Sequence, residues 1–528
     1  MKNRLITSVL MGIVSMSVLA QVDNVSSRPK LVVGIMVDQL RTDYVEYLQS
    51  LFGEKGFKKL MNEGVYFRNI DFEVPNLDAV SSTAMVFTGN YPSKTGITSA
   101  YVYSPETLKE EASLNDPSSI GNFTTETYSP RALLLSTIAD ELKIDGENIG
   151  VVYSLSSDPQ QAIVMAGHAG NSAFWINENT GKWSTSTYYK DLPSSITKRN
   201  YENSISSRLR SMRWEPSLDI NKYIGISEIK REYPFSYIFP SSNKDVYKMF
   251  ATSPLGNEEI TSVAIDYLIG LKLGNRGESI DMLNIGYTLA PFSFDSDEDY
   301  RLELQDAYIR LDEQLGRLFE AIDKNVGLNN TLIFLSSTGY FNDATKDDDV
   351  YNIPTGDFSV KRATSLLNSY LVALHGNGNY VKSYNKGQFY LNHSTIEDKQ
   401  IPISEVAVEA KLFLRKMSGI SDAYTLKDVL SHTNPELEGF RLSVDPKRCG
   451  DIFIEVTPGW NIVDDSKYPP ETKPVRYGKF SAPAFIFSQN IKSQTINTPV
   501  AAIVLAPTIT QILRIRSPNG AISKPLPL

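Results

Sequence analysis

The chain of 528 residues is long enough for one large domain with insertions or for two to three domains. Its hydrophobic content of 41% and charged content of 21% are typical of a soluble globular protein. The formal net charge of −9 provides no basic surface for nucleic acid, so we expect no nucleic-acid partner.

The N-terminus has the pattern of a secretory signal peptide. Lys2 and Arg4 precede an apolar stretch over residues 5–20, which ends in the sequence Val-Leu-Ala that signal peptidase favours. We therefore expect residues 1–20 to be a signal peptide and residues 21–528 to form the mature protein, located in the periplasm or secreted.

The mature chain has no predicted transmembrane segment. Its longest apolar run, residues 499–513, is interrupted by Pro507 and is too short to span a bilayer. The single cysteine, Cys449, excludes an internal disulfide.

Residues 31–38 carry the first candidate functional residue. The apolar run LVVGIMV is typical of a buried parallel strand, and Asp38 follows at its carboxyl end. Ligands of open α/β sheets bind at that edge, so Asp38 is a candidate site residue. The alternative is that Asp38 only caps the helix that follows.

Strand and helix patterns alternate along most of the chain. Predicted helices cover residues 46–62, 131–142, 257–271, 301–323 and 504–513, and predicted strands cover residues 64–67, 149–153, 282–286, 331–335, 451–456 and 484–487. This alternation predicts the α/β class, with a mostly parallel central sheet covered by helices on both faces. Two regions with weak periodicity, at about 172–250 and 340–480, are predicted to be inserted cap regions.

Several motifs resemble those of a known family. They include KLVVGIMVDQLRTDY at 30–44, TGNYPSKTGI at 88–97, DAYIRLDEQLG at 306–316 and NTLIFLSSTG at 330–339. In these motifs the chain is similar to the alkaline phosphatase superfamily. The closest resemblance is to secreted phosphate-irrepressible alkaline phosphatases, and type I phosphodiesterases and nucleotide pyrophosphatases are more distant. The resemblance implies an alkaline phosphatase-like α/β/α sandwich for residues 21–528.

The resemblance also implies a chemistry. Family members hydrolyse phosphate esters with two zinc ions, held by Asp and His, and with a Thr or Ser nucleophile between them. Two close cations bind the phosphoryl oxygens and stabilise the leaving oxygen, and carboxylate and neutral imidazole are suitable zinc ligands.

Only part of the family's site is present in this sequence. Asp38 matches the first metal-binding aspartate of the family. The nucleophile position falls on Asp78 or Ala79, neither of which is a hydroxyl residue. Ser81 is a nearby hydroxyl that could substitute, although small hydroxyl residues in a turn more often cap a helix.

The other ligand positions of the family are largely lost. The next ligand pair falls on Pro291 and Asp295, and Asp295 either binds metal or belongs to an acidic loop. The later Asp-His-Gly of the family is here Thr338-Gly339-Tyr340. None of the four histidines falls on a family ligand position; they are His168, His375, His393 and His432.

The phosphate-binding positions are changed as well. Asp158 and Gln160 stand where phosphatase relatives have lysine and arginine, and Ala100 stands where they have an asparagine. An anionic side chain at position 158 would repel a phosphoryl group.

Our first hypothesis is a catalytically degenerate phosphatase, a pseudophosphatase. It would act as an exported binding or scaffold protein of the cell envelope with a protein partner, no cofactor, and Asp38 and Asp295 as a vestigial metal site. A single zinc ion needs about three protein ligands, which Asp38 and Asp295 do not supply.

The alternative is an enzyme with a rebuilt site. It would be a phosphomonoesterase or phosphodiesterase with one metal or none, with zinc as the alternative cofactor. Asp78 or Ser81 would be the nucleophile, and Asp38 and Asp295 the metal ligands. A third possibility is a small ligand, such as a glycan or nucleotide, in the old pocket.

Overall fold

The computed structural model describes residues 28–75, 77–189, 193–294, 299–341, 356–467, 470–475 and 480–528. The predicted signal peptide, residues 1–20, lies outside the described residues, and so does Asp295. Within the described ranges, no helix is long and apolar enough to cross a bilayer.

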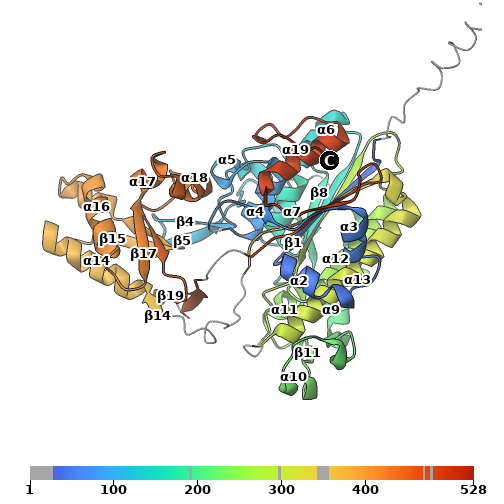
Figure 1. The fold of residues 1–528 in the computed structure, drawn as a ribbon, viewed down its shortest axis with the longest axis horizontal. Helices are drawn as coiled ribbons and strands as arrows, with labels where there is room; N and C mark the ends of the chain where they lie inside the picture. Colours follow the sequence, from blue (N-terminus) through green and yellow to red (C-terminus); the bar gives the residue numbers. More distant parts are fainter. Residues whose placement is uncertain are drawn as a thin grey trace, which may run out of the picture.

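A large twisted sheet forms the centre of the described chain (Figure 1). Ten described strands lie in the order β22-β2-β21-β13-β1-β12-β7-β8-β9-β6. Its middle, from β13 to β8, is parallel, and antiparallel pairs flank it on both sides. The strands are β1 (Leu31–Asp38), β2 (Val65–Phe67), β6 (Gly121–Asn122), β7 (Val152–Ser156), β8 (Ser172–Ile176), β9 (Trp183–Ser186), β12 (Asp281–Thr288), β13 (Thr331–Ser337), β21 (Ala484–Phe487) and β22 (Gln494–Ile496).

Alternate residues of β1 face two separate cores. Val33 and Ile35 belong to the core beneath α12 (Pro254–Gly270) and α13 (Arg301–Asn325). Val32 and Met36 belong to the core on the opposite face, where the covering helices are α4 (Ala79–Thr88), α6 (Ile138–Asp145), α7 (Pro159–Ala166) and α19 (Leu505–Leu513). Because a strand points successive side chains to opposite faces, burial on both faces explains the unbroken apolar run from Leu31 to Val37 in β1. The predicted α/β/α sandwich is confirmed.

The predicted helix over residues 46–62 is wrong. The chain there forms α2 (Thr42–Tyr47), a 3₁₀ turn (Gln49–Leu51) and α3 (Phe57–Glu63). The break is fixed by Asp312 of α13, whose two carboxylate oxygens accept hydrogen bonds of 2.7 Å from the backbone N–H groups of Gly53 and Phe57. A side chain at Gly56 would collide with Asp312. This contact joins segments about 260 positions apart, so local periodicity gave no sign of it.

The region predicted as an insertion at about 172–250 begins inside the sheet. Its first two strands, β8 and β9, extend the central sheet, and short elements follow them. Those elements are α8 (Ser194–Glu202), α9 (Ile205–Arg208), β10 (Arg213–Trp214), α10 (Glu228–Glu232), β11 (Tyr237–Ile238) and α11 (Val246–Ala251).

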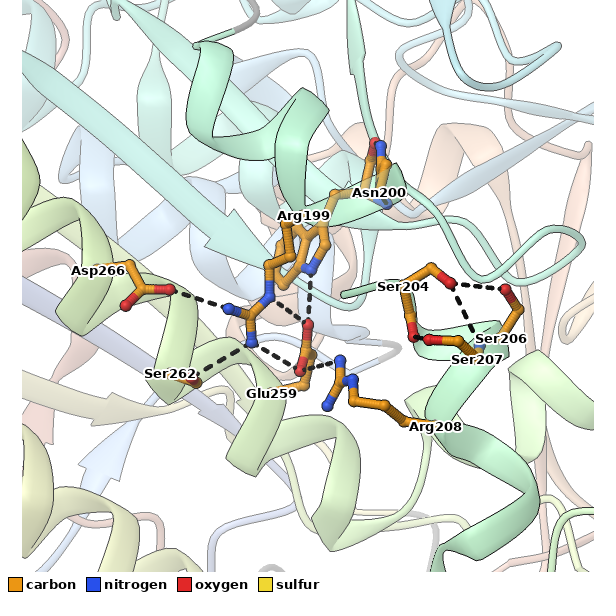
Figure 2. Close-up of polar contacts among 10 residues, drawn as sticks. Arg199, Asn200, Ser204, Ser206, Ser207, Arg208, Glu259, Ser262 and Asp266 are labelled. Carbon is orange, nitrogen blue, oxygen red and sulfur yellow. Dashed lines mark hydrogen bonds and ion pairs between the residues drawn. The ribbon is translucent and has the colours of Figure 1, made fainter. Parts of the chain in front are cut away.

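A buried ion-pair network attaches α8 and α9 to α12 (Figure 2). The Glu259 carboxylate accepts hydrogen bonds from Arg199 of α8, Arg208 of α9 and the Trp183 indole N–H, at 2.8 to 3.0 Å. Burial alone would raise the pKa of Glu259, but the bonds and charges of the two arginines outweigh it and lower that pKa. Asp266 adds a second anion beside Arg199, at 2.9 Å.

The second predicted insertion forms a lobe with its own apolar core, which we call the inserted lobe, residues 356–474 (Figure 1, left). Its strands form a sheet in the order β15-β16-β18-β17 and another in the order β14-β19-β20. Its strands are β14 (Gly356–Ser359), β15 (Val381–Asn385), β16 (Gln388–Leu391), β17 (Ile420–Thr425), β18 (Ile452–Val456), β19 (Trp460–Asp464) and β20 (Glu471–Pro474). Its helices are α14 (Val360–His375), α15 (His393–Asp398), α16 (Ile403–Leu414), α17 (Leu426–Leu430) and α18 (Glu438–Ser443).

Candidate active site

Asp38 lies at the carboxyl edge of the central sheet, as predicted. It is the last residue of β1, between Thr288 of β12 and the end of β13. Its carboxylate oxygen Oδ1 accepts a hydrogen bond of 2.7 Å from the hydroxyl of Thr338, which follows β13 directly. Asp38 therefore holds neighbouring strand ends together, in addition to facing the edge where ligands bind.

The protein around Asp38 disfavours its charged form. Desolvation raises the pKa of Asp38 to about 7, and the charges of Asp158 and Asp78 add to that rise, while hydrogen bonds from Thr338 and Gln39 oppose it. A cation bound next to Asp38 would lower this pKa, because a positive charge stabilises the ionised form of a carboxyl group.

Asp78 is the N-cap of α4. Its Oδ1 accepts hydrogen bonds of 2.9 Å from the backbone N–H and the hydroxyl of Ser81, in a capping box. Its Oδ2 accepts bonds from the Ser99 hydroxyl at 2.7 Å and from the Ala100 backbone N–H at 2.6 Å. Four donors thus surround the carboxylate, which holds it in place and reduces its reactivity as a nucleophile.

Ser81 is fully buried in α4. Its hydroxyl accepts a bond of 3.1 Å from the Asp78 backbone N–H and donates to the Asp78 carboxylate. Both predicted nucleophile candidates are therefore parts of one capping arrangement, and a substrate could reach Ser81 only after the start of α4 moved.

Asp158 adds a third carboxylate to this edge. It follows β7 and caps α7, where its Oδ1 accepts a bond of 2.8 Å from the backbone N–H of Gln161. Desolvation raises the pKa of Asp158 to about 6, and the nearby charge of Asp78 contributes to the rise. Three mutually repelling carboxylates make the edge unfavourable for a bare phosphoryl group.

The described residues do not fit a zinc pair. A zinc site needs about three protein ligands for each ion, and no group of three His, Cys, Asp or Glu side chains in the described chain is arranged to bind a metal. His375 and His393 bond instead to Glu409 and Asp451, inside the inserted lobe. Asp295, the second predicted metal ligand, has no described position.

Two residues of this edge were missed by sequence reasoning. Ser99 donates to Asp78, and the ammonium group of Lys386 donates a bond of 2.9 Å to the hydroxyl of Ser99. Lys386 is 287 positions away from Ser99, in the turn between β15 and β16 of the inserted lobe. The sequence contains no signal that brings these two residues together.

The fold and this edge define a class of protein. Residues 32–479 match the family described as type I phosphodiesterase / nucleotide pyrophosphatase. The chain belongs to this family, within the alkaline phosphatase superfamily.

Three relatives match almost the whole chain. Alkaline phosphatase PafA of Elizabethkingia meningoseptica is 28% identical, over 96% of this chain and 95% of its own. The calcium-transporting ATPase of Myroides odoratus is 28% identical over 94% of each chain, and alkaline phosphatase PhoV of Synechococcus elongatus is 26% identical over 94% and 92%. The crystal structure of wild-type PafA superimposes with a TM-score of 0.80 over 95% of this chain and 99% of that one.

These relatives correct one expectation. The expectation of no cofactor is wrong, because two of the relatives that match nearly the whole chain are alkaline phosphatases. The resemblance to that superfamily implies zinc. Zinc is therefore the cofactor that the family implies, although the described residues alone do not complete a site for it.

Proposed function

We propose that the protein is an exported phosphate-ester hydrolase, a phosphomonoesterase or phosphodiesterase, whose rebuilt active site lies at the carboxyl edge of β1. The observation that carries the proposal is the near full-length similarity to alkaline phosphatase PafA, in sequence and in fold. Asp38 supports it, because this aspartate keeps its position at the end of the central strand and faces the edge where ligands bind.

In this proposal the residues of the edge have distinct tasks. Asp38 supplies the carboxylate that faces the reacting group, and Thr338 orients it through the 2.7 Å hydrogen bond. Asp78 fixes the start of α4 and the Ser99–Ala100 segment through its four hydrogen bonds. The negative charge of Asp158 limits turnover of dianionic substrates unless a cation is present at the edge.

A direct experiment tests the proposal. The purified protein is analysed for bound metal and assayed with a phosphomonoester and a phosphodiester, with and without added zinc. We expect zinc-stimulated turnover that falls by about a hundredfold or more in Asp38→Asn. Asp398→Asn, which alters an exposed carboxylate of the inserted lobe, is the control and should retain activity. Absence of turnover with every ester, at saturating zinc, would refute the hydrolase proposal.

A second candidate function is a binding or scaffold protein of the cell envelope that has lost catalysis. The observation that favours it is the capping box of Asp78 and Ser81 at the start of α4. The two side chains that could attack a phosphate ester are thereby engaged in hydrogen bonds to each other. In that case a stable envelope protein would co-purify with the chain, and Asp38→Asn would change its stability without affecting that association.

A further inference from the structure

The inserted lobe contacts the part of the described chain that carries the central sheet, which we call the main body, beside the candidate active site. The contact is made on the hairpin of β4 (Tyr101–Ser104) and β5 (Lys109–Ala112), which extends towards the lobe (Figure 1). Asn385 donates a hydrogen bond of 2.8 Å to Glu110, and the rings of Tyr103 and Tyr390 lie 5.0 Å apart. These contacts hold the turn between β15 and β16 next to Ser99.

Lys386 occupies the tip of that turn. Its backbone has φ = 44°, in the left-handed region where glycine and asparagine are usual, so a lysine there carries a small conformational cost. The side chain is exposed, and its ammonium group donates a hydrogen bond of 2.9 Å to the Ser99 hydroxyl. A lysine ammonium has three N–H donors, so this bond leaves donors that can be directed to a ligand at the edge.

The position of this cation is significant because the edge is otherwise acidic. Asp38, Asp78 and Asp158 lie close enough for their charges to affect one another. Among the described residues, Lys386 is the only basic side chain with a hydrogen bond to the cluster of Asp78, Ser81, Ser99 and Ala100. A hydrolase of phosphate esters needs a cationic group next to the phosphoryl oxygens. By resemblance, phosphatases of the family have lysine and arginine for this purpose, where this chain has Asp158 and Gln160.

We propose that Lys386 binds the phosphoryl oxygens of the substrate, so that the inserted lobe provides a positive charge to the acidic edge that Asp38, Asp78 and Asp158 form among the described residues. This inference rests on the proposed hydrolase function. The lobe then completes the substrate site, because its contact with the β4–β5 hairpin decides whether the ammonium group reaches the edge.

Phosphate binding to the full chain tests this role. Binding of inorganic phosphate is measured by calorimetry on the purified full chain, with and without added zinc, and KM and kcat are measured with a phosphomonoester under the same conditions. We expect Lys386→Ala to weaken phosphate binding and to raise KM by about tenfold or more, with a smaller change in kcat. Lys386→Arg, which keeps the charge, should restore most of the binding.

Lys382→Ala is the matched control, because this lysine is exposed and lies on the same hairpin, and the hydrogen bonds of Ser99 within the described chain go to other residues, Asp78, Ser113 and Lys386. Its phosphate affinity should equal that of the unmodified protein. Equal affinities of Lys386→Ala and the unmodified protein would overturn the role of Lys386 alone. If the unmodified protein neither binds phosphate nor hydrolyses an ester, the proposed function and this inference both fail.

Discussion

The hydroxyl of Thr338 donates a hydrogen bond of 2.7 Å to the carboxylate of Asp38. The two residues stand at the ends of adjacent parallel strands, β13 and β1. By resemblance, the family has a metal-binding aspartate and histidine just after β13, where this chain has Thr338 and Gly339. A neutral donor has thus replaced a ligand, and it satisfies the carboxylate that remains.

Thr338→Val should lower stability, because it keeps the side-chain shape but leaves Asp38 without this donor. Hydrogen bonds to charged groups contribute about 1.5 to 3 kcal/mol, and we expect a loss of the free energy of unfolding in that range. Urea denaturation at pH 8 measures it.

A double-mutant cycle with Asp38→Asn identifies the partner. If the hydrogen bond is the source of the loss, the two substitutions should show a coupling of about 1 kcal/mol or more. Additive effects would contradict this interpretation and would assign the cost to packing around Thr338.

The position of Asp38 could be predicted because a single local pattern determines it. An apolar run that ends in an aspartate indicates a buried strand and its carboxyl end, and β1 has these bounds, Leu31–Asp38. The strands β13 and β21 were recognisable from their apolar runs alone. The helix boundary near Gly53 was not predictable, because Asp312 imposes it from a distant helix.

The site itself was less predictable than the fold. The contact between Lys386 and Ser99 depends on how the inserted lobe packs against the rest of the described chain, and neither residue lies in a motif. A capping role was expected for Ser81, because small hydroxyl residues in a turn often cap a helix, whereas Asp78 was considered only as a nucleophile and is in fact the N-cap of α4.

Asp158→Asn should stabilise the protein at pH 8. Desolvation and the charge of Asp78 raise the pKa of Asp158 to about 6, above its usual value in an unfolded chain. The folded state therefore binds the proton more tightly, and the associated stability is present at low pH and is lost as pH rises from about 4 to about 6. Asparagine is equally suited to the N-cap and carries no charge.

The expected gain for Asp158→Asn is about 1 to 3 kcal/mol at pH 8, reduced by solvent screening because the side chain is partly exposed. Denaturant unfolding at several pH values measures it. The difference from the unmodified protein should disappear below about pH 4, where both side chains are neutral. A difference that does not vary with pH would show that charge is not its cause.

Asp78→Ala should cost more than the loss of an ordinary helix cap. The substitution removes the acceptor of the Ser81 N–H and also leaves the Ser99 hydroxyl and the Ala100 N–H without their partner. A cap alone contributes about 0.5 to 2 kcal/mol, and we expect a total loss of about 2 to 4 kcal/mol in the free energy of unfolding.

Thr425→Ala is the matched control for Asp78→Ala, since Thr425 forms a capping box at the start of α17 in the inserted lobe. Its loss should stay near 1 kcal/mol in denaturant unfolding. Equal losses for the two variants would show that Asp78 acts as a cap and does not fix the Ser99–Ala100 segment.

Glu259→Ala should be among the most destabilising single substitutions of the described chain. It leaves the mostly buried Arg199 without its bidentate partner (Figure 2), and it removes the acceptor of the Trp183 indole N–H. Breaking a buried ion pair by removing one partner costs about 3 to 5 kcal/mol.

The neighbouring substitution Glu258→Ala is the control, because Glu258 forms a more exposed pair with Arg310 and its loss should cost about 1 kcal/mol or less. Thermal and denaturant unfolding of the two variants compare these costs, and a similar small loss for both would contradict a structural role of the Glu259 network in attaching α8 and α9 to α12.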